Sequence, residues 1–171
     1  MGQPGNGTGH RAATARHSLE ECMDSVKLSP HTAGLLGYAG LIPFVLAALA
    51  IHVPWPGAAL STTIFLSYGA VILAFLGGIQ WGLALTPGVE RANERVVVGV
   101  LPALIAWPLL VLPAPATAII VLAAGFAALW LWERRRCAIT GPAWYPALRT
   151  RLTLAVLLCH GVALAGVMVG R

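Results

Sequence analysis

Apolar residues dominate five stretches of the chain, separated by short segments rich in proline, glycine or charge. The stretches cover residues 34–53, 60–85, 96–112, 116–132 and 152–169. An α-helix of roughly 17 residues or more, rising about 1.5 Å per residue, crosses the hydrocarbon core of a bilayer. The pattern therefore predicts an all-α polytopic integral membrane protein, with a compact bundle of five transmembrane helices in a domain over residues 34–170.

The first 33 residues have a different character. Small, polar and glycine-rich positions predict a largely disordered cytoplasmic tail, because such a segment buries too little apolar area to offset its ordering entropy. Ser18 and Glu21 have the spacing of a capping box, which predicts a short helix near residues 19–28 that Pro30 ends. The tail is too long and too polar for the start of a secretory signal, so we expect the first span to stay in the mature protein.

Composition and charge support a membrane protein and give its orientation. The chain is 58% hydrophobic and 10% charged, against roughly 45–50% and about 25% in soluble domains. With five crossings, ten of the eleven Lys and Arg residues fall on the side of the amino terminus. The positive-inside rule then predicts an inside amino terminus and an outside carboxyl terminus. No segment resembles a nucleic-acid-binding module, so we assign the net charge of +5 to topology and lipid contact.

The second apolar stretch carries small residues at four-residue intervals, namely Ala70, Ala74, Gly78 and Gly82. Small residues at this spacing let transmembrane helices approach closely, so the stripe predicts a helix-packing face. The alternative is that these residues are there only because glycine and alanine are common in transmembrane helices.

Four polar residues within the spans form a candidate intramembrane polar site. Thr62 and Gln80 are 18 residues apart, and Thr153 and His160 are seven apart, so each pair shares one helix face. We expect both faces to point into the bundle. An ionisable residue in a membrane is a functional hypothesis by default, whereas a histidine hydrogen-bonded between helices is a common structural solution. Both interpretations of His160 stay open.

The sequence predicts neither catalysis nor a cofactor. All six acidic residues fall outside the predicted spans, so we expect no carboxylate within the membrane and no catalytic residue. Three scattered cysteines lack the paired spacing of a zinc site. His52 lies near one boundary and His160 near the midplane, at depths that differ by about 10 Å. They could not bind one haem together, so we expect no metal site, no cofactor and no enzyme.

The segment between the fourth and fifth predicted spans, residues 133–151, combines arginines with Trp144 and Tyr145. Guanidinium groups beside interfacial aromatics suit anionic lipid headgroups. Simple topology anchoring explains the same pattern, and the two are compatible. The predicted lipid contacts are Arg134, Arg135, Arg136, Arg149 and Arg151.

Three strings resemble a known family: LGYAGLIPF at residues 36–44, YGAVILAFLGGIQWGLAL at residues 68–85, and the Trp144–Tyr145 loop leading into LRTRLTLAV. The chain is similar over about residues 33–169 to a domain-of-unknown-function family of small membrane proteins that includes eukaryotic transmembrane protein 69. The resemblance implies a five-helix protein of bacterial inner membranes with mitochondrial relatives. It brings no established activity, cofactor or catalytic residue.

We therefore expect a non-enzymatic integral membrane protein that acts through membrane lipids or a membrane-protein partner, in assembly or organisation, and a homodimer is open. The alternative is a carrier or channel for a small neutral or anionic solute. The expected location is the bacterial cell inner membrane, with the mitochondrial inner membrane as the alternative.

Overall fold

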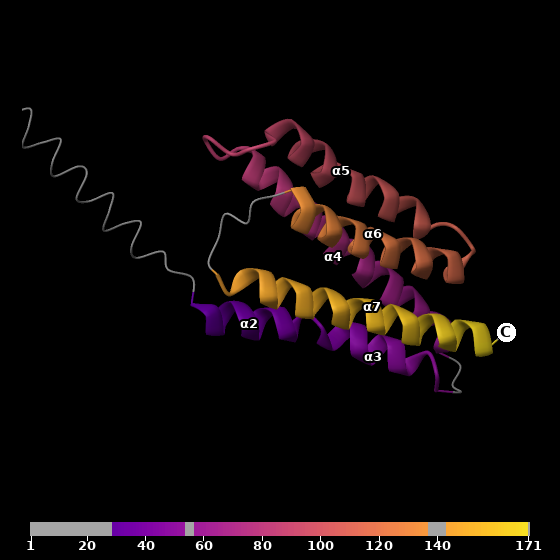
Figure 1. Cartoon of the computed structure of the whole chain (residues 1–171). Coiled ribbons are helices and arrows are strands. Elements are labelled where there is room, and N and C mark those ends of the chain that lie inside the picture. The colour runs from indigo at the N-terminus through magenta and orange to yellow at the C-terminus, as the bar shows by residue number, and fades with distance from the viewer. Residues whose placement is uncertain (1–28, 54–56, 137–142, 171) are drawn as a thin grey trace, which may run out of the picture. The chain divides into compact units, whose positions relative to one another are not determined.

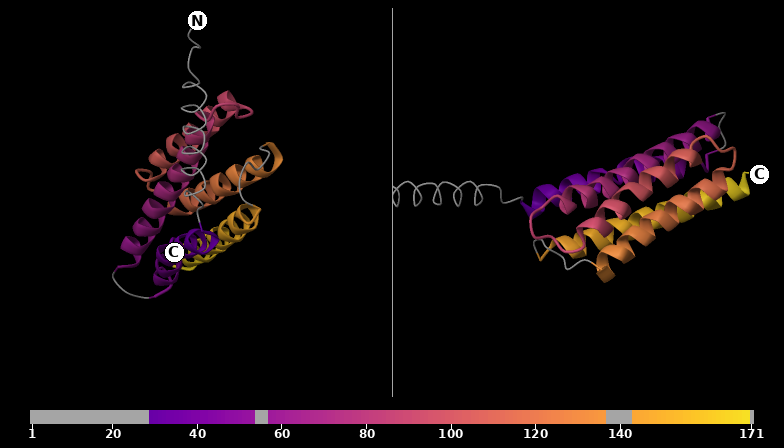
Figure 2. Two further views of the ribbon diagram at one scale, coloured as in Figure 1. Left: turned by 90° about the vertical axis from the view of Figure 1, so that its left-hand side faces the viewer. Right: turned by 90° about the horizontal axis from the view of Figure 1, so that it is seen from above.

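The structure is a computed structural model that describes residues 29–53, 57–136 and 143–170. The short helix predicted near residues 19–28 lies outside the described residues. The described helices are α2 (Pro30–Ala39), α3 (Ile42–Ala50), α4 (Ala58–Ala84), α5 (Ala92–Leu109), α6 (Pro115–Arg136) and α7 (Tyr145–Val169). The chain divides into two compact units, residues 1–35 and 36–171. Within the second unit, α3 to α7 run alongside one another (Figures 1 and 2).

In the described part of the chain, five helical segments are long and apolar enough to span a membrane, which confirms the prediction of an all-helical protein with five spans. The first of them, Pro30–Ala50, consists of α2 and α3. Several helix ends differ from the predicted span ends. The third span begins at Ala92, four residues early, and α6 continues through Arg136. The fifth span begins at Tyr145 and not at residue 152. Charged residues extend these helices because they pair with one another at the helix ends, as described below.

A short break between α2 and α3 places Gly40 and Leu41 outside both helices. Pro43 is near the start of α3, where its missing N–H costs least. The Tyr68 hydroxyl on α4 donates a 2.8 Å hydrogen bond to the Gly40 carbonyl. This bond ties the break to the central helix and satisfies a carbonyl that the interruption leaves accessible.

Aromatic rings form the centre of the bundle. The ring of Phe44 on α3 meets those of Phe65 on α4 and Phe126 on α6 edge to face, with centroids 5.6 and 6.1 Å apart. All three side chains are almost completely buried. Edge-to-face contacts of this kind stabilise aromatic pairs beyond their buried area. The layer fixes α3, α4 and α6 against one another.

Helices α4 and α5 approach each other closely at Gly77 and Gly99. A Cβ atom added to Gly77 would overlap the Gly99 carbonyl oxygen, and one added to Gly99 would lie 2.9 Å from the Gly77 oxygen. The two backbones therefore touch, and neither position tolerates a side chain. Close approach of this type is how transmembrane helices gain packing energy.

The four small residues of the predicted stripe on α4 differ in their burial. Ala70 is buried and Ala74 half-buried. Gly78 and Gly82 are exposed, and an added Cβ would meet no atom within 4 Å at either position. These two glycines make no helix contact with the described residues, because the contact of α4 with α5 is centred on Gly77, about 100° around the helix from Gly78.

Candidate functional site

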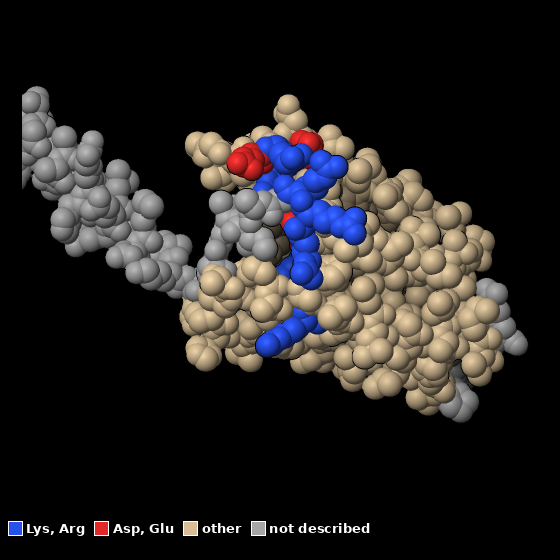
Figure 3. All heavy atoms as spheres, viewed as in Figure 1, with Lys and Arg blue, Asp and Glu red and all other residues tan. Residues whose placement is uncertain are grey.

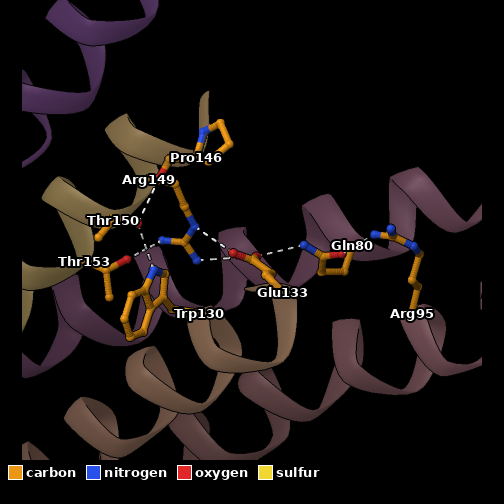
Figure 4. A network of polar contacts seen from close by, with 8 residues as sticks. All are labelled: Gln80, Arg95, Trp130, Glu133, Pro146, Arg149, Thr150 and Thr153. Carbon is orange, nitrogen blue, oxygen red and sulfur yellow. Dashed lines mark hydrogen bonds and ion pairs between the residues drawn. The ribbon is translucent and has the colours of Figure 1, made fainter. Parts of the chain in front are cut away.

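A continuous polar network joins α4, α5, α6 and α7 where α4 and α6 end and α5 and α7 begin (Figure 4). We call this end of the bundle the arginine end. Arg95 Nη1 donates to Gln80 Oε1 at 2.7 Å, and Gln80 Nε2 donates to Glu133 Oε1 at 2.8 Å. Glu133 Oε2 accepts from Arg149 Nε at 3.0 Å, and Arg149 Nη1 donates to Thr153 Oγ1 at 3.0 Å.

The network is buried, so the loss of any one contact costs more stability than it would at the surface. Arg95, Gln80, Arg149 and Thr153 are each 9% exposed or less. The Glu133 side chain is 16% exposed. Removing one partner from a buried ion pair typically costs about 3–5 kcal/mol, because it leaves a charge without compensation. The arrangement therefore holds four helices in one register.

Arg95 and Arg149 differ in how their charge is balanced. Arg149 pairs directly with Glu133. Arg95 has the Gln80 amide and the Glu90 backbone carbonyl, at 3.3 Å from its Nε, as partners. Among the described residues no carboxylate lies within ion-pair distance of Arg95. Gln80 thus bridges the Arg95 guanidinium and the Glu133 carboxylate, which pairs with Arg149. With two guanidinium groups and one carboxylate, these residues carry an excess positive charge.

A second set of contacts joins α6 to α7 beside this network. Trp130 Nε1 donates a 3.3 Å hydrogen bond to Thr150 Oγ1, and the Thr150 hydroxyl donates to the Pro146 carbonyl at 2.8 Å. The Arg134 guanidinium lies over the Trp130 ring, 5.1 Å from its centroid. This cation–π contact orders an arginine that is otherwise exposed.

The exposed arginines gather at the arginine end (Figure 3). Seven arginines and three glutamates lie in the described part of the chain. Glu133 is bound within the network, and Glu94 pairs with Arg91 at 2.9 Å. Positive charge therefore dominates this surface. Its exposed members with no carboxylate partner among the described residues are Arg134, Arg135, Arg136 and Arg151.

His160 lies away from this network, in the aromatic layer. Its ring centroid is 4.8 Å from that of Phe65, 5.5 Å from Phe126 and 5.7 Å from Phe44. Nδ1 is 2.8 Å from the Val156 carbonyl, and because a carbonyl only accepts, Nδ1 carries the proton. Nε2 is then a buried acceptor, and no described residue donates to it.

A groove of about 370 Å³ opens at the other end of the bundle. It lies between the first half of α4 and the last turns of α5 and α7, with the end of α3 and the start of α6 completing it. Its lining is apolar apart from three hydroxyl residues of α4. The lining residues are Ile51, Ala59, Thr62, Thr63, Leu66, Ser67, Leu109, Leu110, Leu112, Pro115, Gly166, Val167 and Gly170.

Comparison with known proteins assigns the chain to a family. The family model described as "Protein of unknown function (DUF3429)" matches residues 29–165, which include the network and most of the groove lining. The chain belongs to this family. It is also 33% identical over 152 residues to Transmembrane protein 69 of Xenopus tropicalis, across 84% of this chain. The chain spans about 59% of the length of that curated relative. No solved structure matches.

These findings confirm the resemblance seen in the sequence and make this DUF3429 protein a multi-pass membrane protein. The family has no established activity. The matched region begins at residue 29, one residue before α2, and ends four residues before α7 does. The helical bundle is thus what this chain shares with its relatives.

The four residues of the predicted polar site do not form one site. Gln80 and Thr153 enter the network at the arginine end, joined through Glu133 and Arg149. His160 lies in the aromatic layer, and Thr62 lines the groove. The prediction that these helix faces point inward is right for Gln80, Thr153 and His160, which are buried, and Thr62 is half-buried.

Two charged residues have surroundings that the sequence does not predict. Glu133 is not in a loop but in α6, so a carboxylate does enter the helical bundle. Arg149 is not available to lipid headgroups because its guanidinium is buried against Glu133 and Thr153. Sequence reasoning also missed Arg95. The four-residue spacing of Arg149 and Thr153, one helical turn, was the available signal that α7 begins early.

The described residues offer no ready metal centre. No three His, Cys, Asp or Glu side chains gather anywhere in the described ranges. His52 Nε2 lies 2.9 Å from the Val162 carbonyl, which joins the end of α3 to α7 and occupies that nitrogen.

Proposed function

We propose that this DUF3429 protein is a non-enzymatic membrane protein that works through lipid or membrane-protein partners, in the assembly or organisation of a membrane complex. The observation that supports the proposal is that some of its arginines are buried and others are exposed. Arg95 and Arg149 are buried and hold helices together, while Arg134, Arg135, Arg136 and Arg151 stay exposed. The buried arginines hydrogen-bond to other helices, whereas the exposed arginines can contact molecules outside the bundle.

Anionic lipid headgroups are the partner we favour for the exposed arginines. A guanidinium presents several donors in a plane that matches a phosphate. Basic side chains next to a membrane span each gain about 1 kcal/mol from an anionic surface. This role places the arginine end at the cytoplasmic face of a bacterial inner membrane, or at the matrix face of a mitochondrial one. A second copy of the chain, or another membrane protein, would then contact the lipids that these arginines bind.

Native mass spectrometry on protein extracted with its surrounding lipid tests this role. We expect wild-type protein to retain phosphatidylglycerol or cardiolipin above the bulk lipid ratio. A variant with Arg134→Gln, Arg135→Gln and Arg136→Gln should lose the enrichment. Arg91→Gln is the matched control, because Arg91 is exposed at the same end but already paired with Glu94. Equal enrichment in wild type and triple variant would contradict the lipid role, and a co-purifying protein would favour assembly.

The second candidate function is a carrier for a small neutral or anionic solute. The groove favours it, since it enters the bundle from the end opposite the network. The contact between Gln80 and Glu133 closes the arginine end. Cysteine introduced at Leu76, one turn before Gln80 and packed against the core, would test this candidate, because a carrier must expose this depth of the bundle to a membrane-impermeant thiol reagent during turnover. Complete protection of this cysteine, together with reactivity at Ser67→Cys, would count against transport.

A further inference from the structure

The groove has the chemistry of a binding site. The thirteen described residues that line it include no ionisable side chain. Most are aliphatic, and the polar groups are the hydroxyls of Thr62, Thr63 and Ser67. All three belong to α4, so the hydroxyls of the described lining come from one helix. Ligand sites are mostly apolar pockets of roughly 300–1,000 Å³ with a few placed polar groups, and a volume of about 370 Å³ falls within that range.

Ser67 distinguishes this groove from an ordinary gap between helices. Hydroxyls in transmembrane helices usually donate to the carbonyl four residues earlier. Two neighbours on α4 do so: Ser61 bonds to the Gly57 carbonyl at 3.3 Å and Thr63 to the Ala59 carbonyl at 3.1 Å. Ser67 makes no hydrogen bond to a described residue. Its hydroxyl is therefore free to donate into the groove that it lines.

The depth of Ser67 makes this unpaired hydroxyl costly. It lies nine residues after the first residue of α4, so about 14 Å along the helix axis at the usual rise. That is close to the middle of a hydrocarbon core about 30 Å thick. A polar group at such a depth needs a partner, because lipid tails offer none. A molecule in the groove would supply it.

We propose that the groove binds a small uncharged amphipathic molecule that carries a hydroxyl or carbonyl oxygen. Its oxygen accepts a hydrogen bond from Ser67 at the deep end. Its apolar body packs against Leu66, Leu109 and Val167, which line the walls. The described lining residues offer no ionisable group, which selects against charged molecules because their charge would be desolvated without compensation from these residues. The site is separate from the exposed arginines, so it does not depend on the lipid role proposed above.

Photolabelling of the full chain in phosphatidylcholine vesicles tests the proposal, with a diazirine derivative of octan-1-ol as the probe. Adducts should map by mass spectrometry to lining residues such as Leu66, Leu109 and Val167, and unlabelled octan-1-ol should compete for them. Ser67→Ala should weaken this competition about five-fold, which is the loss expected for one hydrogen bond. Ser61→Ala is the matched control, since this serine bonds to its own helix and does not line the groove. Unlabelled octan-1-ol should compete for labelling of this variant as well as it does for the wild type.

Two outcomes would overturn the site. Adducts spread evenly over lipid-facing residues such as Leu104 and Leu158, which are 64% and 70% exposed, would show only partition into the bilayer. Equal competition in Ser67→Ala and wild type would show that the groove accepts any apolar chain, as it would a lipid tail. A phosphatidylcholine with the diazirine on its acyl chain separates the cases further. It should label the lining less than the octanol probe does, and equal labelling would contradict a dedicated site.

Discussion

Gln80 and Glu133 meet at 2.8 Å although 53 residues separate them in the chain. The contact places a neutral carboxamide between the Glu133 carboxylate and the Arg95 guanidinium. Gln80 suits this position because its oxygen accepts from the cation while its nitrogen donates to the anion. A carboxylate or an amine at residue 80 could do only one of these. The register of α4 against α6 therefore depends on an amide here.

Glu133→Gln should destabilise the protein strongly. The change removes the only carboxylate that pairs with Arg149 among the described residues and leaves two buried guanidinium groups without it. We expect a loss of about 3–5 kcal/mol, measured by thermal or denaturant unfolding in detergent micelles. Glu94→Gln serves as the control, because its pair with Arg91 is exposed and should change stability by less than about 1 kcal/mol.

A double variant, Glu133→Leu with Arg149→Met, separates charge from packing. Replacing both members of a buried pair with apolar residues is often neutral or stabilising. The double variant should therefore be more stable than Glu133→Gln alone. If it is equally unstable, the cost lies in lost packing or in Gln80 and Thr153, and our account of the network as an ion-pair device is wrong.

Gly77→Ala should impair folding far more than Gly78→Ala. A Cβ at Gly77 would overlap the Gly99 carbonyl oxygen, whereas one at Gly78 would meet no atom within 4 Å. Both substitutions raise helix propensity equally, so the difference isolates the helix contact. Unfolding of the two purified variants in the same detergent measures it. Equal stability would mean that α4 and α5 do not touch at this point.

This pair of glycines shows what the sequence could and could not predict. Hydropathy predicts five helices because a run of about 20 apolar residues is typical of a transmembrane helix. The choice between Gly77 and Gly78 needs the direction of the neighbouring helix, which a single helix's pattern does not contain. The sequence predicts a loop at Glu133, because a charge normally ends a span. Its partner Arg149 lies 16 residues on, across a segment whose path the sequence leaves open.

Gly69→Ser should stabilise the bundle relative to Gly69→Ala. A Cβ at Gly69 would lie 3.8 Å from the unpaired Nε2 of His160 and no closer than 3.4 Å to any other atom. A serine hydroxyl there could donate to that nitrogen, which an alanine could not. Interhelical hydrogen bonds in membranes are worth about 0.6 kcal/mol and seldom more than about 1.7. Unfolding of the two variants should differ by such an amount. Serine no better than alanine would contradict a hydrogen bond from residue 69 to Nε2.

The arginine end should face the cytoplasm, or the matrix in a mitochondrial setting. All seven described arginines lie at this end of the helices, and basic residues near span ends are retained on the inner side. A cytoplasm-specific fluorescent reporter inserted at Pro87, between α4 and α5, should therefore fluoresce. A periplasm-specific enzyme reporter at Pro113, between α5 and α6, should be active, and it serves as the matched loop at the opposite end. The two insertion points lie before and after α5, so they must be on opposite sides of the membrane if α5 crosses it. Activity of the periplasmic reporter at Pro87 would overturn the orientation, and the same reporter active at both positions would remove α5 from the spans.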